Sequence, residues 1–399
     1  KCLQRLVRLD LPVPKTVALR FETVRAIAGG RMPDIRALLD VFGQGALLSV
    51  RSSSQMPDWG GPGTILNIGM NDEKAAALAK THGESAADAL YVSFIRGYAV
   101  DVLRLDADAF EDPITPRLAK SAFEAEMDEP FPQDPCEQLA EVLKSMARAW
   151  EGTTARLLRQ AQGAPADAGL GLVVQEMALG IGQGLSGSGV VQFASPETGE
   201  AQVTGRWLPQ AQGRAALSES DAQFIVSDKR GKSLEDVAPE QVAALTSAGA
   251  LMRQRLREEM QIEFTLMNGH LSILDAVKCP RSGRAEVAIA VALAEDGIIT
   301  SDEALLRIPP FTLNQLLHRQ VSPIAARDVL TRGIAASPGA ATGKIVFSAS
   351  AAQAMAAQGE PCILVRRETS PEDIRGMHAA QAVLTERGGM TSHAAVIGR

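Results

Sequence analysis

Apolar residues recur every three or four positions in two long stretches of the chain, residues 72–102 and 135–150. The second stretch contains a complete stripe of Leu139, Val142, Leu143, Met146 and Trp150. This spacing places the apolar side chains on one face and predicts amphipathic helices in both stretches. Residues 241–260 predict a further helix.

Short apolar runs bounded by turn residues predict strands over residues 46–51, 170–177 and 190–195. A glycine-rich segment, residues 180–189, precedes the third of these strands. Residues 261–267 and 270–274 predict a hairpin around Asn268-Gly269. Towards the end of the chain, residues 377–399 predict a helix, a strand, a glycine turn and the start of another helix.

The order of these elements predicts an α/β (α+β) protein with three regions. Residues 1–277 form the first region, with a helical insert over about 106–165 that begins in an acidic, proline-marked stretch. Residues 278–332 show no strand signal and predict a helical linker. Residues 333–399 are rich in small residues and predict a separate small domain.

Composition narrows the class of protein. The chain has 399 residues, which predicts two or three domains, and a net charge of −7 with 4% aromatic residues argues against nucleic-acid binding. The four cysteines are far apart, which argues against structural zinc and fits a reducing, cytoplasmic compartment. No run predicts a membrane span. The first residue is Lys1, so we expect a partial chain.

The segment with the clearest chemistry is GGMTSHAAV, residues 388–396. Its glycine pair allows a sharp turn, and Thr391 and Ser392 are good helix N-cap residues. His393 then falls in the first turn of a helix, where backbone N–H groups and the helix dipole favour an anion. The pattern predicts either a histidine nucleophile, stabilised when phosphorylated, or a helix-capping loop with a structural histidine.

Several segments closely resemble the pyruvate phosphate dikinase family. The densest similarity lies in ASPGAATGKIVF, residues 336–347, in residues 368–397, and in EDGIITSDEALLRI, residues 295–308. Upstream, VRSSSQMPDWGGPGTILNIGMND, FPQDPCEQL, SGSGVVQFASPETGE and MQIEFT resemble the nucleotide-binding part of that family. The GGMTSHAA string is more similar to the dikinases than to related phosphohistidine enzymes.

This resemblance implies an ATP-grasp-like nucleotide-binding region, a helical linker and a truncated swivelling β/β/α phosphohistidine domain. In the family, a histidine takes a pyrophosphoryl group from ATP with Mg²⁺, passes one phosphate to inorganic phosphate and carries the other to pyruvate. His393 matches that histidine. Thr391 matches a threonine that regulates plant members, although a simple N-cap also explains it. The barrel that binds pyruvate or phosphoenolpyruvate would belong to another part or partner, and a homodimer is compatible with the resemblance.

The resemblance also assigns a nucleotide site, with departures. Arg51 matches a phosphate-binding arginine, and Gln261-Ile262-Glu263 stands where the family has Asp-x-Glu, which leaves Glu263 as a metal ligand. Asp275 stands where the family has glutamine, and Val277 where it has arginine. The retained glycine loop, Ser186, Gly187, Ser188 and Gly189, would cover phosphates through backbone N–H groups or is a plain hairpin tip.

Two hypotheses explain the departures. In one, the nucleotide site has decayed, and the chain is a catalytically silent homologue that acts as a binding or regulatory module. In the other, Gln261 and Asp275 have exchanged places, which conserves two carboxylates and one amide. The hairpin register separates them: a two-residue Asn268-Gly269 turn predicts that Glu263 pairs with Leu274, and a three-residue loop predicts that it pairs with Asp275.

Overall fold

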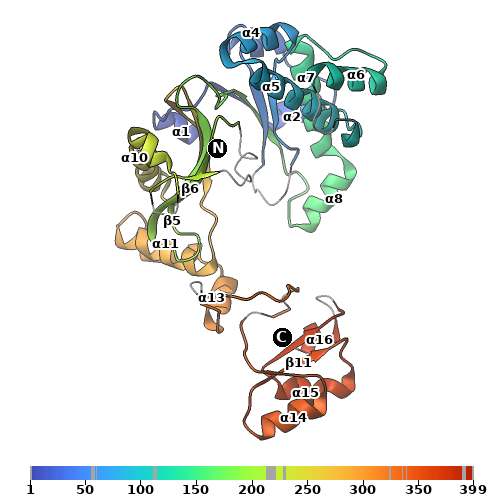
Figure 1. Cartoon of the computed structure of the whole chain (residues 1–399), viewed down its shortest axis with the longest axis vertical. Helices are drawn as coiled ribbons and strands as arrows, with labels where there is room; N and C mark the ends of the chain where they lie inside the picture. Colours follow the sequence, from blue (N-terminus) through green and yellow to red (C-terminus); the bar gives the residue numbers. More distant parts are fainter. Residues whose placement is uncertain are drawn as a thin grey trace. The chain divides into compact units, whose positions relative to one another are not determined.

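The computed structural model describes the chain except residues 1, 55–58, 60, 111–114, 213–221, 228–230, 323–324, 335, 338, 389–391 and 398–399. It describes five residues by their backbone only: Cys2, Asn314, Gln315, His393 and Val396. Helices and sheets are mixed throughout, so the α+β class is confirmed. Residue contacts divide the chain into two compact units (Figure 1). Unit 1 contains Lys1–Phe193 and Val203–Lys278, and unit 2 contains Ala194–Gln202 and Cys279–Arg399.

The first sheet of unit 1 is antiparallel and has the strand order β1-β4-β2-β3. Its strands are β1 (Thr16–Leu19), β2 (Leu48–Ser53), β3 (Ile65–Ile68) and β4 (Gly171–Glu176). Helices α2 (Phe21–Ala28), α5 (Glu84–Arg96) and α7 (Pro135–Glu151) contact this sheet (Figure 1). The predicted stripe on residues 135–150 is confirmed, because its five apolar residues are all buried in this core.

Seven further helices precede the glycine-rich segment in the described part of the chain. They are α1 (Cys2–Arg8), α3 (Ile35–Asp40), α4 (Asp72–His82), the π-helix η2 (Gly97–Val102), the 3₁₀-helix η3 (Ala107–Phe110), α6 (Pro116–Met127) and α8 (Thr153–Ala161). The first, α1, packs against β9 (His270–Lys278) of the second sheet, where Leu6 joins that sheet's core. Local chemistry sets several boundaries. Asn71 accepts the backbone N–H of Lys74 at the start of α4, and Gly83, at a φ of 89°, separates α4 from α5.

The second sheet of unit 1 has the order β7-β6-β5-β8-β9. Its strands are β5 (Gly187–Ala194), β6 (Ala201–Pro209), β7 (Gln223–Phe224), β8 (Met260–Met267) and β9 (His270–Lys278), accompanied by α9 (Leu234–Val237) and α10 (Pro239–Leu256). The predicted β8–β9 hairpin is confirmed. Asn268 and Gly269 form its turn with φ values of 52° and 83°, which suits the type I′ turn expected for Asn-Gly.

Unit 2 begins with three helices, α11 (Gly283–Glu295), α12 (Ser301–Arg307) and α13 (Pro310–Leu317). The helical linker predicted over residues 278–332 is therefore helical only as far as Leu317, because the described residues from 318 to 332 form no helix. All of these residues are exposed, and Leu330 is 88% exposed. A helix gains most of its stability in a protein by packing an apolar face, and this stretch packs none.

The C-terminal part of unit 2 is a parallel sheet with the order β10-β11-β12. Its elements are β10 (Lys344–Val346), α14 (Ala349–Ala357), β11 (Cys362–Arg366), the 3₁₀-helix η5 (Pro371–Asp373), α15 (Ile374–Ala379), β12 (Ala382–Thr385) and α16 (His393–Ile397). The helix, strand and helix start predicted here are confirmed. Among the described residues, no helix combines the length and the apolarity needed to cross a membrane.

Candidate functional site

Arg51 of β2 and Glu263 of β8 meet between the two sheets of unit 1, although 212 residues separate them in the chain. Nη1 of Arg51 lies 3.4 Å from Oε2 of Glu263. The two side chains are only 16% and 18% exposed. Two residues that the sequence assigned to one nucleotide site are therefore in contact in the folded chain.

Asp275 lies directly opposite Glu263 in the β8–β9 pairing. The turn has two residues, Asn268 and Gly269. The pairing of Glu263 with Leu274, which a two-residue turn predicted, is nevertheless wrong. Glu263 pairs with Asp275 and Phe264 pairs with Ile273, so Leu274 is an extra residue in a β-bulge. The amide of Gln175 donates to the Leu274 carbonyl at 3.4 Å, so a bond from the first sheet supports the bulge.

The bulge places two carboxyl groups beside one guanidinium. Burial raises the pKa of Asp275 above its usual range, and the charge of Glu263 acts in the same direction. A hydrogen bond of 2.8 Å from the Ala276 backbone N–H and the charge of Arg51 act in the opposite direction without cancelling the rise. The cluster therefore has a surplus of acidic groups that a bound cation would stabilise.

Gln261 points to the same face of β8 as Glu263, because the two residues are two positions apart. Its amide donates a 3.0 Å hydrogen bond to Oε1 of Gln192 on β5. Val277 pairs with Gln261 and is 41% exposed. The positions that depart from the family pattern therefore extend the same face as Glu263 and Asp275.

Ser186 and the first three residues of β5 supply the predicted phosphate-covering loop, and the structure gives each of them a packing or bonding partner. Ser186 Oγ accepts the Asn268 backbone N–H at 2.9 Å, and Ser188 Oγ donates to the Ala211 carbonyl at 2.9 Å. A Cβ added at Gly187 would lie 2.4 Å from the Leu208 oxygen, and one at Gly189 would lie 2.5 Å from the Phe264 ring. Close packing therefore explains both glycines, and their predicted contact with phosphates stays a prediction.

Two side chains that the sequence did not single out bond to the preceding glycine-rich segment. Gln210 accepts the Gly182 backbone N–H at 3.0 Å and donates back to the Gly182 carbonyl at 2.9 Å. Oδ1 of Asn268 accepts the Gly184 backbone N–H at 3.1 Å. Both side chains belong to turns at strand ends, and only the QAQG string and the Asn-Gly turn marked them in the sequence.

The donor set suits a magnesium–phosphate ligand. Among the described residues no group of three or more His, Cys, Asp or Glu side chains is arranged to hold a metal ion. Mg²⁺ typically takes one or two carboxylates and completes its coordination with phosphate oxygens and water, so Glu263 and Asp275 would suffice. The Nε–H of Arg51 is buried and has no hydrogen-bond partner in the part of the chain that the structure describes, so it remains available to an anion.

The GGMTSHAAV segment lies in unit 2. Ser392 Oγ accepts the Ala395 backbone N–H at 3.3 Å, so the predicted capping role is confirmed for Ser392. Gly388 has a φ of 131°, which agrees with the predicted glycine turn. His393 is the first residue of α16. Thr391, and the side chain of His393, lie outside the described residues.

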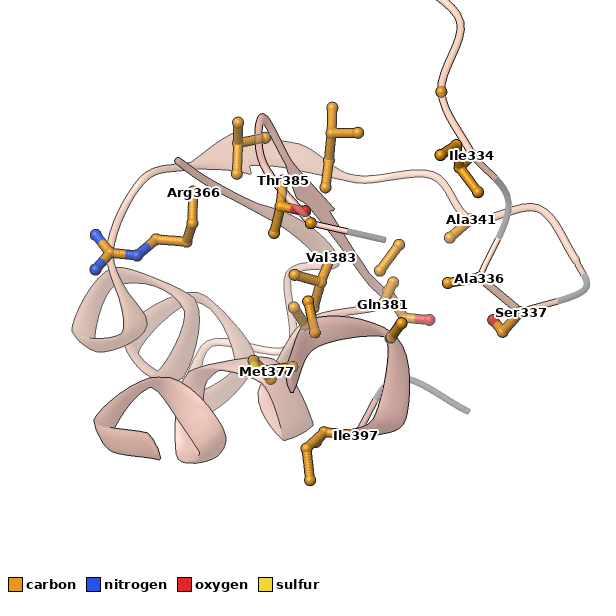
Figure 2. A pocket seen from close by; sticks show the side chains of 18 of the residues that line it. Ile334, Ala336, Ser337, Ala341, Arg366, Met377, Gln381, Val383, Thr385 and Ile397 are labelled. Carbon is orange, nitrogen blue, oxygen red and sulfur yellow. The ribbon is translucent and has the colours of Figure 1, made fainter. Parts of the chain in front are cut away.

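A hollow of about 1360 Å³ adjoins this segment within unit 2 (Figure 2). Ile334 and Ser337 line it from the extended segment before β10, and Val383 and Ile397 line it from β12 and α16. Figure 2 shows Ile334, Ala336, Ser337 and Ala341 on one side and Val383, Met377 and Ile397 on the other. Ser392 and Ala394, the residues before and after His393 in the sequence, also line the hollow.

Comparison with known proteins identifies the class of the C-terminal part first. Residues 358–399 match the family model of the mobile domain of PEP-utilising enzymes. The match includes β11, α15, β12 and α16, so the C-terminal part of unit 2 carries the fold elements of that domain.

Whole-chain similarity then identifies the family. The chain is 35% identical to pyruvate, phosphate dikinase of Rhizobium meliloti, in an alignment covering 100% of this chain and 50% of the relative. The Clostridium symbiosum and Zea mays chloroplastic enzymes are 35% and 34% identical over 88% of this chain. The chain belongs to the pyruvate, phosphate dikinase family. It spans about half the length of the curated relatives it matches.

Proposed function

We propose that this chain carries out the ATP half-reaction of a pyruvate, phosphate dikinase-like phosphotransferase. Unit 1 binds ATP together with Mg²⁺, and His393 in unit 2 receives phosphate from it. The convergence of Arg51, Glu263 and Asp275 at one place supports this proposal most directly. A decayed site has no physical reason to keep a guanidinium and two carboxylates together in a half-buried position, where each charge is costly.

The residues have separate tasks in this proposal. Arg51 binds phosphate oxygens through a planar, permanently charged group, which suits phosphate geometry. Glu263 and Asp275 hold Mg²⁺, whose chemistry is to neutralise charge on the phosphates. Gln261 contributes a neutral amide on the same face. Phosphoryl transfer depends mostly on such positioning and charge stabilisation.

The covalent step transfers a pyrophosphoryl group from ATP to His393. A ring nitrogen of His393 forms a bond to the β-phosphorus of ATP, the bond from that phosphorus to the α,β-bridging oxygen breaks, and AMP leaves with the electron pair. Inorganic phosphate then takes the terminal phosphoryl group, which releases pyrophosphate and leaves one phosphate on His393. Transfer of that phosphate to pyruvate would use a barrel domain from another part or partner.

The proposal also assigns the regions. Residues 1–277 would be an ATP-grasp-like nucleotide-binding region, residues 278–332 the linker, and residues 333–399 part of the phosphohistidine domain, with Thr391 as its regulatory position. The division of contacts after Lys278 is compatible with the first boundary. The family model over residues 358–399 supports the third region.

The test is transfer of label from ATP labelled at the β-phosphorus, with Mg²⁺ and inorganic phosphate, to the chain and to His393→Ala. We expect acid-labile label on the parent and none on the variant. His82→Ala is a matched control, because His82 lies in unit 1, where it bonds to Thr81 at the end of α4. Absence of label on the parent, together with absence of ATP binding by calorimetry, would overturn the proposal and favour the catalytically silent homologue.

A further inference from the structure

We propose that Glu263 pairs with Arg51 in the free protein and binds a divalent cation in the nucleotide complex. Cation binding and phosphate binding are therefore coupled through this one carboxylate. This inference rests on the proposed function and adds a regulation of the same site.

The Arg51–Glu263 contact has the features of a temporary pair. The distance of 3.4 Å is longer than the roughly 2.7–2.9 Å of a strong bond between guanidinium and carboxylate. Among the described residues the Arg51 side chain donates one hydrogen bond, whereas a guanidinium offers five N–H donors. Its Nε–H is buried without a partner. Arg51 can therefore gain hydrogen bonds by exchanging Glu263 for a phosphate group.

Glu263 in turn has a better cationic partner available. Asp275 faces it across the β8–β9 pairing, and the two carboxylates exceed the single Arg51 charge. A divalent cation bound by both carboxylates would offset that surplus. Once Glu263 and Asp275 share a cation, the attraction of Glu263 for Arg51 falls and Arg51 becomes available to an anion.

The same geometry weakens the binding of an anion in the absence of a metal ion. A metal-free phosphate group near Arg51 would have to replace Glu263 while two carboxylates remain close by. Binding of either ligand should therefore strengthen binding of the other by the same factor, as thermodynamic linkage requires, and factors of about 5 to 150 are typical.

Two measurements by calorimetry test the coupling. The first compares ATP binding in EDTA with ATP binding in excess Mg²⁺, for the parent and Glu263→Gln. We expect Glu263→Gln to bind metal-free ATP about 5-fold or more tightly than the parent, and to bind ATP with Mg²⁺ more weakly. Glu141→Gln is the matched control, since Glu141 pairs with Lys144 elsewhere in unit 1, and both of its affinities should equal the parent's.

The second measurement uses Mn²⁺ alone, which suits carboxylate ligands and needs no nucleotide. Removal of the competing guanidinium in Arg51→Met should tighten Mn²⁺ binding by about 5-fold or more. Metal-free ATP affinity in Glu263→Gln equal to that of the parent, or unchanged Mn²⁺ affinity in Arg51→Met, would overturn the inference and leave the proposed function standing. No ATP binding by the parent in either condition would overturn both.

Discussion

The side-chain amides of Asn67 and Gln212 bond to each other twice. Nδ2 of Asn67 donates to Oε1 of Gln212 at 3.0 Å, and Nε2 of Gln212 donates to Oδ1 of Asn67 at 2.8 Å. Asn67 is the third residue of β3 and is fully buried, whereas Gln212 follows β6 of the other sheet. This pair of hydrogen bonds therefore joins the two sheets of unit 1. The Asn67 amide is shielded from water, because Asn67 is fully buried.

Gln212→Ala should lower the free energy of unfolding by about 1–3 kcal/mol, because it leaves the buried Asn67 amide with unmet hydrogen bonds. Urea unfolding measures the loss. Gln160→Ala is the matched control, since Gln160 is an exposed glutamine of α8 in the same unit, and it should cost less than about 1 kcal/mol. Equal losses for both variants would contradict a special role for the Asn67–Gln212 pair.

Gly189→Ala should also destabilise the chain, by about 1–3 kcal/mol, because the new methyl group would overlap the Phe264 ring. Gly97→Ala is the comparison. Gly97 has a φ of −59° and open space where a Cβ would lie, so alanine should stabilise by about 0.4–1 kcal/mol. Loss of ATP affinity in Gly189→Ala with unchanged thermal unfolding would instead indicate a direct phosphate contact.

Val277→Arg should increase ATP affinity about 5- to 10-fold in the presence of Mg²⁺. Val277 is 41% exposed on the face that carries Asp275, so an arginine can be accommodated and would add a charged donor for phosphate. The gain should shrink at high salt. Val237→Arg, at an exposed position of α9, is the control and should leave affinity unchanged. No gain at position 277 would show that bound phosphates lie away from this strand.

Asp373 should stabilise unit 2 at neutral pH. Burial opposes its ionisation, but hydrogen bonds from Ser370 and the charge of Arg366 outweigh burial and lower the pKa of Asp373 below its ordinary 3.8. A lowered pKa gives stability that is present above pH 3.8 and is lost as pH falls through the folded-state pKa. Asp373→Asn should therefore cost about 1–2 kcal/mol at pH 7 and much less near pH 2.

Hydrogen exchange in residues 362–385, followed by mass spectrometry, measures this effect locally. Asp373→Asn should exchange faster than the parent at pH 7, after correction for intrinsic rates, and the ratio should approach one in acid. Glu386→Gln is the control, because Glu386 pairs with Arg367 at the surface and should contribute little. A ratio that stays constant from pH 7 to pH 2 would rule out a contribution from the Asp373 charge.

The sequence by itself determined the local structure and the ancestry. Periodicity in residues 135–150 predicts α7 because a helix buries one stripe, and Asn268-Gly269 predicts the hairpin turn because both residues accept positive φ. The GGMTSHAA string carries the family resemblance. These signals depend on neighbours a few positions apart, so they can be read without knowing the fold.

The family resemblance assigned Arg51, Glu263 and Asp275 to one site, but tertiary structure alone decided how these residues meet. The turn length predicted Leu274 opposite Glu263, yet a bulge places Asp275 there. Gln175, a residue of the other sheet about a hundred positions away, donates a hydrogen bond to the Leu274 carbonyl at the bulge. The packing of Phe264 against Gly189 likewise joins distant segments. Arg51 and Glu263 come from different sheets, and Gly189 and Phe264 come from two neighbouring strands of one sheet. Such contacts form only when segments distant in the chain assemble, so no local pattern encodes the meeting of Arg51, Glu263 and Asp275.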